Sequence, residues 1–188
     1  MLAVIALLVS PALAADDERL SATIIYARGN ALYKSDARGR NESQLVQLPS
    51  KATVRAMRTD IAGKTLLVDV GGKWSWMPLD RPRDRPPDRP GVALAGLPCA
   101  DGPAQLATDG TSVVCRSIES PDKSVLVQLD TGTVTKLDAP PTGARLVGSG
   151  RARKLVWADA NGVWGAPPNN LQAKTKLAAE APRRGFLP

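Results

Sequence analysis

The sequence contains no histidine and only two cysteines in 188 residues. Without an imidazole ring, the chain cannot form a Ser-His-Asp or Cys-His nucleophilic centre, an HExxH zinc site or a histidine proton shuttle. Two cysteines without histidine do not make an ordinary zinc site, and no segment has the pattern of a phosphate-binding glycine loop or a calcium loop. The sequence therefore predicts no metal and no other cofactor.

Long uninterrupted helices are also disfavoured, because glycine and proline each occur 16 times. These residues interrupt helices and are typical of chains with many short elements joined by turns. Apolar residues make up 43% of the chain, which is enough to build a buried core. The composition favours a β-rich globular domain.

An apolar run, Leu2–Leu13, opens the chain and is followed by small residues and an acidic cluster that begins at Asp16. This order predicts a signal peptide at residues 1–15, cleaved near Ala14 or Ala15, although no basic residue precedes the run. The run is shorter than the about 20 residues that a membrane span needs, and no later segment is long and apolar enough to cross a bilayer. We expect a periplasmic or secreted protein with no membrane span after signal cleavage.

The two cysteines, Cys99 and Cys115, lie 16 positions apart. An oxidising compartment favours a disulfide between them, and closing a loop of this size contributes about 3 kcal/mol in the loop-entropy description. The alternative is two buried thiols, because free cysteine packs as a small apolar side chain.

A β-rich motif recurs along the chain, and its four copies start 42, 47 and 42 residues apart. Each copy is followed by a turn and a second strand-like run, and a third run then ends near proline, which cannot donate to a ladder. Between copies there is room for one more strand, at residues 53–57, 104–108 and 144–148. The four copies begin at Thr23–Ala27, Thr65–Val70, Ser112–Arg116 and Lys154–Ala158.

Four antiparallel strands in a repeat of this length are typical of a β-propeller blade. The sequence thus predicts an all-β fold, a β-propeller-like array of about four four-stranded blades forming a single domain at residues 20–188. The alternatives are an open or partial propeller and a β-sandwich or meander. The first repeat lacks a leading strand, which the tail at residues 183–188 could supply.

Two segments of the third repeat, Ser120–Leu126 and Asp130–Leu137, resemble the Ser-Pro-Asp-Lys and Asp-x-x-Gly elements of TolB-type (PD40-like) β-propeller repeats. Residues Ile24–Tyr33 and Lys34–Gly39 are similar to the paired middle strands of the same repeats. The resemblance implies a periplasmic or cell-envelope propeller that binds other proteins, and it transfers no catalytic residue.

Residues 80–91 form a low-complexity segment of proline, arginine and aspartate. Such a composition favours extended, solvated chain, so we interpret it as a loop insertion within the second repeat. Loops on a rigid scaffold often bind partners, which makes the arginines candidate contacts. The alternative is a tolerated insertion with no partner. The candidates are Arg81, Arg83, Arg85 and Arg89.

The net charge is +7, and basic residues are concentrated late in the chain. They could face an anionic surface such as lipid head groups or acidic polysaccharide, whereas nucleic acid is not an expected partner of an exported protein. Ordinary solvated charge on strand faces is the alternative. The residues are Arg151, Arg153, Lys154, Lys174, Lys176, Arg183 and Arg184.

Six aromatic residues fall in the predicted middle strands, where packing is a more common role than a ligand platform. They are Tyr26, Tyr33, Trp74, Trp76, Trp157 and Trp164. Six aspartates fall in predicted turns, where local hydrogen bonding is their usual role. They are Asp60, Asp69, Asp109, Asp122, Asp130 and Asp159.

These observations favour an exported, non-enzymatic module that binds an envelope protein. One alternative is a carboxylate-dependent lyase or hydrolase acting on polysaccharide, which needs only two of the aspartates to converge. Another is that the chain is the N-terminal fragment of a longer propeller-containing enzyme.

Overall fold

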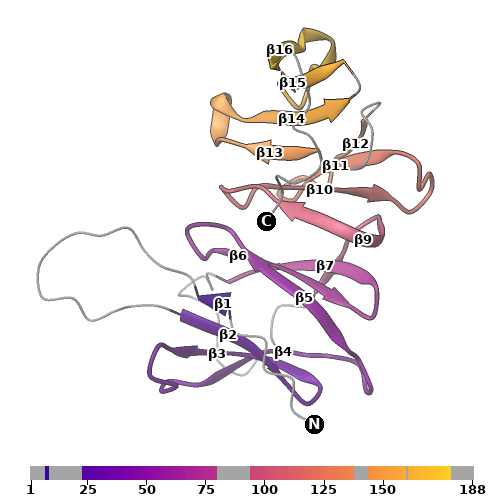
Figure 1. The fold of residues 1–188 in the computed structure, drawn as a ribbon. Coiled ribbons are helices and arrows are strands. Elements are labelled where there is room, and N and C mark those ends of the chain that lie inside the picture. The colour runs from indigo at the N-terminus through magenta and orange to yellow at the C-terminus, as the bar shows by residue number, and fades with distance from the viewer. Residues whose placement is uncertain (1–6, 9–22, 80–93, 138–143, 160, 179–188) are drawn as a thin grey trace, which may run out of the picture. The chain divides into compact units, whose positions relative to one another are not determined.

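The computed structural model describes residues 7–8, 23–79, 94–137, 144–159 and 161–178. The chain divides into two compact units, Met1–Leu97 and Pro98–Pro188, and each contains two four-stranded antiparallel sheets (Figure 1). Within each sheet the strands follow one another in chain order, so every sheet is an up-and-down meander. The predicted fold class is confirmed: the protein is all-β, with four sheets that each have the strand order of a propeller blade.

The first unit contains the sheets β1–β4 and β5–β8. The strands of the first sheet are β1 (Leu7–Leu8), β2 (Thr23–Arg28), β3 (Ala31–Asp36) and β4 (Ser43–Gln47). Those of the second sheet are β5 (Val54–Thr59), β6 (Thr65–Val70), β7 (Lys73–Pro78) and β8 (Ala95–Gly96).

The second unit contains the sheets β9–β12 and β13–β16. The strands of its first sheet are β9 (Cys99–Leu106), β10 (Ser112–Ser117), β11 (Ser124–Gln128) and β12 (Val134–Leu137). Those of its second sheet are β13 (Arg145–Val147), β14 (Lys154–Asp159), β15 (Gly162–Ala166) and β16 (Thr175–Ala178). Two short 3-10 turns, η1 (Gly150–Ala152) and η2 (Leu171–Ala173), interrupt the connections of that sheet.

In the first unit, a tight turn that contains glycine joins the two middle strands of each sheet. Gly29, between β2 and β3, has φ +60°, and Gly71 and Gly72, between β6 and β7, have φ +60° and +86°. These values lie in the left-handed region that glycine adopts without steric cost. Register follows from these turns: Tyr26 pairs with Tyr33 across the first hairpin, and Leu67 with Trp76 across the second.

Each unit has its own core between its two sheets. In the first unit, Ile25 and Leu32 of the first sheet are in one buried cluster with Leu66, Val68 and Met77 of the second sheet. The corresponding cluster of the second unit joins apolar residues of β10, β11 and β12 to apolar residues of β13 and β14. A single sheet cannot bury both of its faces, so the pairing of sheets is what makes each unit compact.

The leading strand of the first sheet comes from the apolar N-terminal run. Leu7 pairs with Ile25 and Leu8 pairs with Ile24, so this run occupies the leading-strand position for which the C-terminal tail is the predicted candidate. The rest of the predicted signal peptide, the proposed cleavage site and the tail at residues 183–188 lie outside the described residues. Removal of residues 1–15 would leave β2 as the edge strand of this sheet.

Several predicted boundaries need correction. The leading strand expected at residues 104–108 instead begins at Cys99, runs through Gly102 and ends at Leu106, with a register shift opposite Cys115–Ser117. The third run of the second repeat, which was expected to end near proline, is reduced to the two-residue strand Ala95–Gly96 among the described residues. A bulge depends on pairing with the neighbouring strand, which the spacing of the repeats does not show. The single-domain prediction for residues 20–188 stays a prediction.

Candidate functional site

The second unit brings two neighbouring turns together at one end of its sheets. In a meander, the connection between the first two strands lies at the same end as the connection between the last two. The β9–β10 turn and the β13–β14 connection are the first connections of their two sheets, and hydrogen bonds join them. Thr108 donates its hydroxyl to the carbonyl of Gly148 at 3.0 Å, and the Gly150 N–H donates to Asp109 Oδ2 at 3.2 Å.

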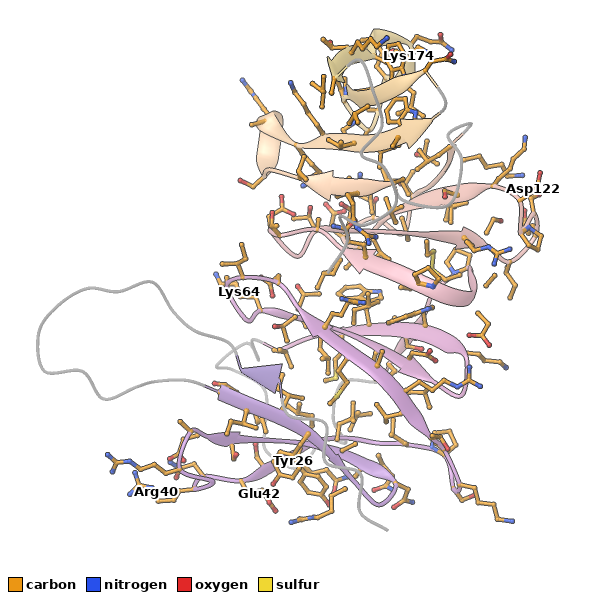
Figure 2. The ribbon with its side chains drawn as sticks, viewed as in Figure 1. Tyr26, Arg40, Glu42, Lys64, Asp122 and Lys174 are labelled. Carbon is orange, nitrogen blue, oxygen red and sulfur yellow. A yellow bond between two sulfur atoms is a disulfide. The ribbon has the colours of Figure 1, made fainter. Side chains whose placement is uncertain are left out.

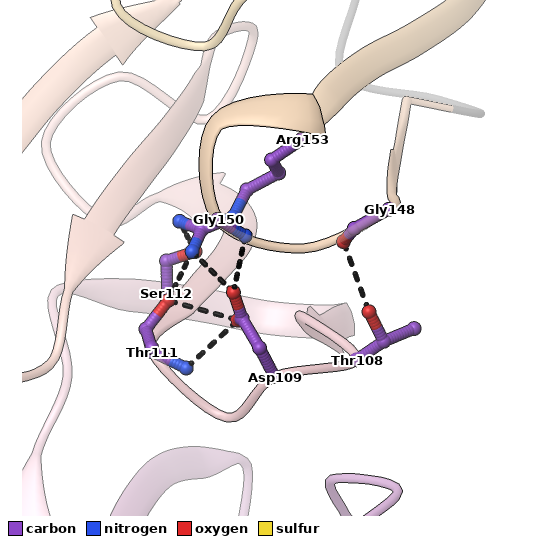
Figure 3. A network of polar contacts seen from close by, with 7 residues as sticks. All are labelled: Thr108, Asp109, Thr111, Ser112, Gly148, Gly150 and Arg153. Atoms are coloured by element: carbon purple, nitrogen blue, oxygen red, sulfur yellow. Dashed lines mark hydrogen bonds and ion pairs between the residues drawn. The ribbon is translucent and has the colours of Figure 1, made fainter.

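Asp109 and Arg153 are the centre of this polar network (Figure 3). Arg153 Nη2 lies 2.5 Å from Asp109 Oδ2 and also donates to the Thr111 hydroxyl, while Nη1 donates to Ser112 Oγ at 3.0 Å. The other oxygen of Asp109 accepts the backbone N–H of Thr111 at 3.2 Å and its hydroxyl at 2.9 Å. Both groups are thus held by several bonds, which fixes their rotamers.

Burial makes this ion pair different from an ordinary surface pair. The side chains of Arg153 and Asp109 are 12% and 19% exposed. Burial alone would raise the pKa of the Asp109 carboxyl, but hydrogen bonds from Thr111, Arg153 and Gly150 outweigh it, so the pKa is lowered from its ordinary value. The carboxylate is therefore ionised at neutral pH, and it offsets the charge of the guanidinium.

Gln105 on β9 makes a second set of hydrogen bonds between the same two sheets. Its side-chain amide donates to the Leu146 carbonyl at 3.2 Å and accepts the Leu146 N–H at 3.0 Å. One side chain thereby satisfies both backbone groups of a residue on the short edge strand β13. A buried backbone group without a partner lowers the stability of the fold. The Gln105 bonds and the Asp109 network therefore fix β13 and η1 against the preceding sheet.

A pocket of about 330 Å³ opens beside this network. Three chain segments line it: the end of β11, the β13–β14 connection, and the loop that follows β15. The lining residues are Gln128, Gly150, Arg151, Arg153, Pro167, Pro168 and Asn169. Arg151 is exposed, and among the described residues it has no ion-pair partner, in contrast to Arg153. The pocket thus combines amide groups, proline rings and one unpaired cation.

The basic residues that were predicted to share one surface in the C-terminal part have different surroundings in the structure. Arg153 is paired with Asp109, and Arg151 lines the pocket. Lys174 and Lys176 instead lie over the ring of Trp164, with Nζ at 4.7 Å and 5.6 Å from the ring centroid. Arg183 and Arg184 lie outside the described residues. Binding of an anionic surface by the whole set stays a prediction.

The two cysteines are joined in a disulfide, with Cα atoms 5.6 Å apart. It links the start of β9 to β10, within one sheet of the second unit. The proline-arginine segment with Arg81, Arg83, Arg85 and Arg89 lies outside the described residues, so its role as a partner contact stays a prediction.

Four of the six aspartates bind the backbone of their own turns. Asp60 Oδ1 accepts the N–H groups of Lys64 and Thr65, both at 2.7 Å, and Asp69 Oδ1 accepts the Gly72 N–H at 2.8 Å. Asp130 and Asp109 likewise accept from turn amides that follow them. These bonds are the local role that aspartate usually has in turns. Among the described residues, no group of three or more His, Cys, Asp or Glu side chains could hold a metal ion.

Sequence reasoning missed a polar cluster on the first sheet. Tyr26 and Tyr33 stack with ring centroids 5.8 Å apart, and Arg28 lies 4.4 Å over the Tyr33 ring. Glu42 lies close to Tyr26 (Figure 2) and accepts a bond from its hydroxyl. It also accepts bonds from Arg28 at 2.7 and 3.1 Å. The Tyr26 and Arg28 bonds lower the pKa of Glu42. Alternation of Tyr26 with the buried Ile25 could have placed the tyrosines on the opposite face, but nothing local indicated Glu42.

Sequence comparison gives no relative: no protein-family profile and no curated protein matches this chain. Solved structures give distant similarities. A proposed 6-phosphogluconolactonase from Bacteroides uniformis is 13% identical over 84% of this chain and 52% of its own, with a TM-score of 0.43. The C-terminal WD40 domain of Sif2 is 13% identical over 85% of this chain and 58% of its own, with a TM-score of 0.41.

The extracellular domain of BT4673 from B. thetaiotaomicron is 13% identical over 82% of this chain and 20% of its own, with a TM-score of 0.43. This chain thus spans about half, or less, of the length of these structures. The fold description rests on the strand order and register of the chain itself. In the part of the chain that the structure describes, no helix is long and apolar enough to span a membrane.

Proposed function

We propose that this protein is an exported, non-enzymatic module of the cell envelope. It binds another protein through the end of its second unit at which the β9–β10 turn and the β13–β14 connection lie. The observation that carries the proposal is the pocket between the β13–β14 connection and the loop after β15. Its lining offers hydrogen-bond donors and apolar rings on a scaffold fixed by Asp109 and Gln105. Pre-organised concave sites of this kind bind with little ordering cost.

Export and a protein partner are supported by separate features. The apolar run at residues 2–13 followed by small residues is typical of a secretory leader. The resemblance of residues 120–137 to TolB-type repeats favours an envelope protein as the partner. Four of the six aspartates that an enzyme could use are committed to turn amides, which favours binding over catalysis.

The test is photo-crosslinking in cells with a photoreactive amino acid at one of two positions. Asn169 lines the pocket, whereas Ile118 is 61% exposed at the β10–β11 turn, the opposite end of its sheet. We expect a discrete protein adduct from position 169 and none from position 118, with the mature chain recovered outside the cytoplasm. Adducts only from position 118, or no protein adduct from either position, would overturn the proposal.

A further inference from the structure

Two arginines line the pocket, Arg151 and Arg153, and only Arg153 forms an ion pair within the described part of the protein. Arg153 gives three hydrogen bonds to Asp109, Thr111 and Ser112, and its charge is offset by the carboxylate. Arg151 has no such partner among the described residues and is exposed at the pocket. No acidic residue is among the residues that line the pocket. One positive charge is therefore left for a ligand.

The neutral groups of the lining complement that charge. Gln128 carries an amide NH₂ that can donate to an anion, and Pro167 and Pro168 provide apolar surface without donors. A guanidinium matches the planar geometry of a carboxylate, with two parallel N–H···O bonds. One unpaired guanidinium balances the charge of one carboxylate, whereas a phosphate dianion would keep an uncompensated charge.

We infer that this pocket takes a carboxylate side chain from an acidic segment of the partner protein, with Arg151 as its charged contact. This inference rests on the proposed function, because a protein supplies the acidic segment. The amide of Gln128 donates to the same carboxylate, and its methylene groups lie on the proline rings.

Asp109 acts on this site through the backbone rather than by contact with the ligand. Its carboxylate holds the Gly150 N–H and the Arg153 guanidinium, which lie on either side of Arg151 in the chain. Gly150 has φ +51°, a backbone conformation that residues other than glycine rarely adopt. The network thus fixes the turn from which Arg151 projects, and Asp109 is a positioning residue.

Fluorescence anisotropy with a labelled peptide of alternating Glu and Ala tests the inference, and the same peptide with Gln in place of Glu is its neutral counterpart. We expect the full chain to bind the Glu peptide and Arg151→Gln to weaken binding about tenfold, the size of a charge-assisted hydrogen bond. Arg145→Gln, which removes the same charge from an exposed strand position outside the pocket, is the matched control and should change binding less than about twofold.

Three results would overturn the inference: equal weakening by Arg151→Gln and Arg145→Gln, equal binding of the Glu and Gln peptides, or binding of a polyuronate but not of the Glu peptide. The crosslinking experiment separates this failure from failure of the proposed function. A protein adduct at position 169 that persists in Arg151→Gln refutes the carboxylate contact and leaves protein binding standing. Arg151-dependent peptide binding without any protein adduct supports the carboxylate site and refutes the proposed function.

Discussion

Replacing Asp109 with Asn removes one negative charge from a largely buried ion pair and keeps the shape of the side chain. Arg153 would retain its bonds to Thr111 and Ser112 but lose the anion that offsets its charge. Exposed ion pairs contribute about 0–1 kcal/mol, whereas removing one partner of a buried pair costs about 3–5 kcal/mol. The side chains of this pair are 12% and 19% exposed, so it lies between those limits. We expect Asp109→Asn to lower the free energy of unfolding around the pair by about 2–3 kcal/mol.

The loss should be local, because the pair fixes the β13–β14 connection against the preceding sheet. Hydrogen exchange followed by mass spectrometry, on peptides that cover residues 144–159, is the direct assay. A loss of this size makes opening roughly 30- to 150-fold more frequent, and peptides from the first unit should keep their rates.

A double-mutant cycle with Arg153→Gln separates the pair from its other contacts. If the two side chains act together, the free energy of unfolding falls less in the double variant than the two single variants add up to. We expect this difference to be at least about 1 kcal/mol. Losses that add to within about 0.5 kcal/mol, or exchange rates unchanged by Asp109→Asn, would refute the role we give to this pair.

The same pair predicts a pH dependence with a defined sign. The pKa of Asp109 is lower in the folded protein than in the unfolded chain, so ionisation stabilises the fold above the unfolded pKa of about 3.9. That contribution is lost as the pH falls below about 4 towards the folded pKa. The stability difference between the natural chain and Asp109→Asn should therefore be constant from neutral pH down to about 4 and shrink below it.

Three further predictions concern other contacts. Reduction of the Cys99–Cys115 disulfide should lower the free energy of unfolding by about 3 kcal/mol, measured as the urea midpoint with and without reductant; an unchanged midpoint would count against it. Gly148→Ala should lower the thermal midpoint, because φ is +76° and a Cβ would lie 2.8 Å from a backbone oxygen of η1; a variant as stable as the natural chain contradicts this. Arg28→Gln should leave the urea midpoint nearly unchanged, with any small decrease diminished by salt, because Arg28 and Glu42 form an exposed pair; a large decrease that salt does not diminish would contradict this.

Much of the fold could be predicted from the sequence, because its determinants are local. The spacing of the repeats predicted four sheets of four strands, and the turns predicted after the first run of each repeat include Gly29 and Gly71, where the structure has positive φ. Strand ends were less predictable. The bulge opposite Cys115–Ser117 and the two-residue strand Leu7–Leu8 depend on pairing with a neighbouring strand.

The candidate site was largely hidden from sequence reasoning. Arg153 looked like one of several late basic residues, and its partner Asp109 lies 44 positions earlier, in another sheet. One signal was present: Asp60 and Asp109 occupy the same turn in successive sheets, and each accepts amide bonds there. That repeat could have marked the turn, but the packing of neighbouring sheets decides that Arg153 pairs with it and Arg151 does not.

The most direct test of the account is hydrogen-exchange footprinting of the full chain with and without the Glu peptide. The account predicts slower exchange in residues 148–153 and at Asn169 and Asn170, because Pro167 and Pro168 carry no amide hydrogen, and it predicts no change at the opposite turn, residues 117–123. Protection of residues 117–123 alone, or protection of the pocket segments that persists in Arg151→Gln, would contradict it.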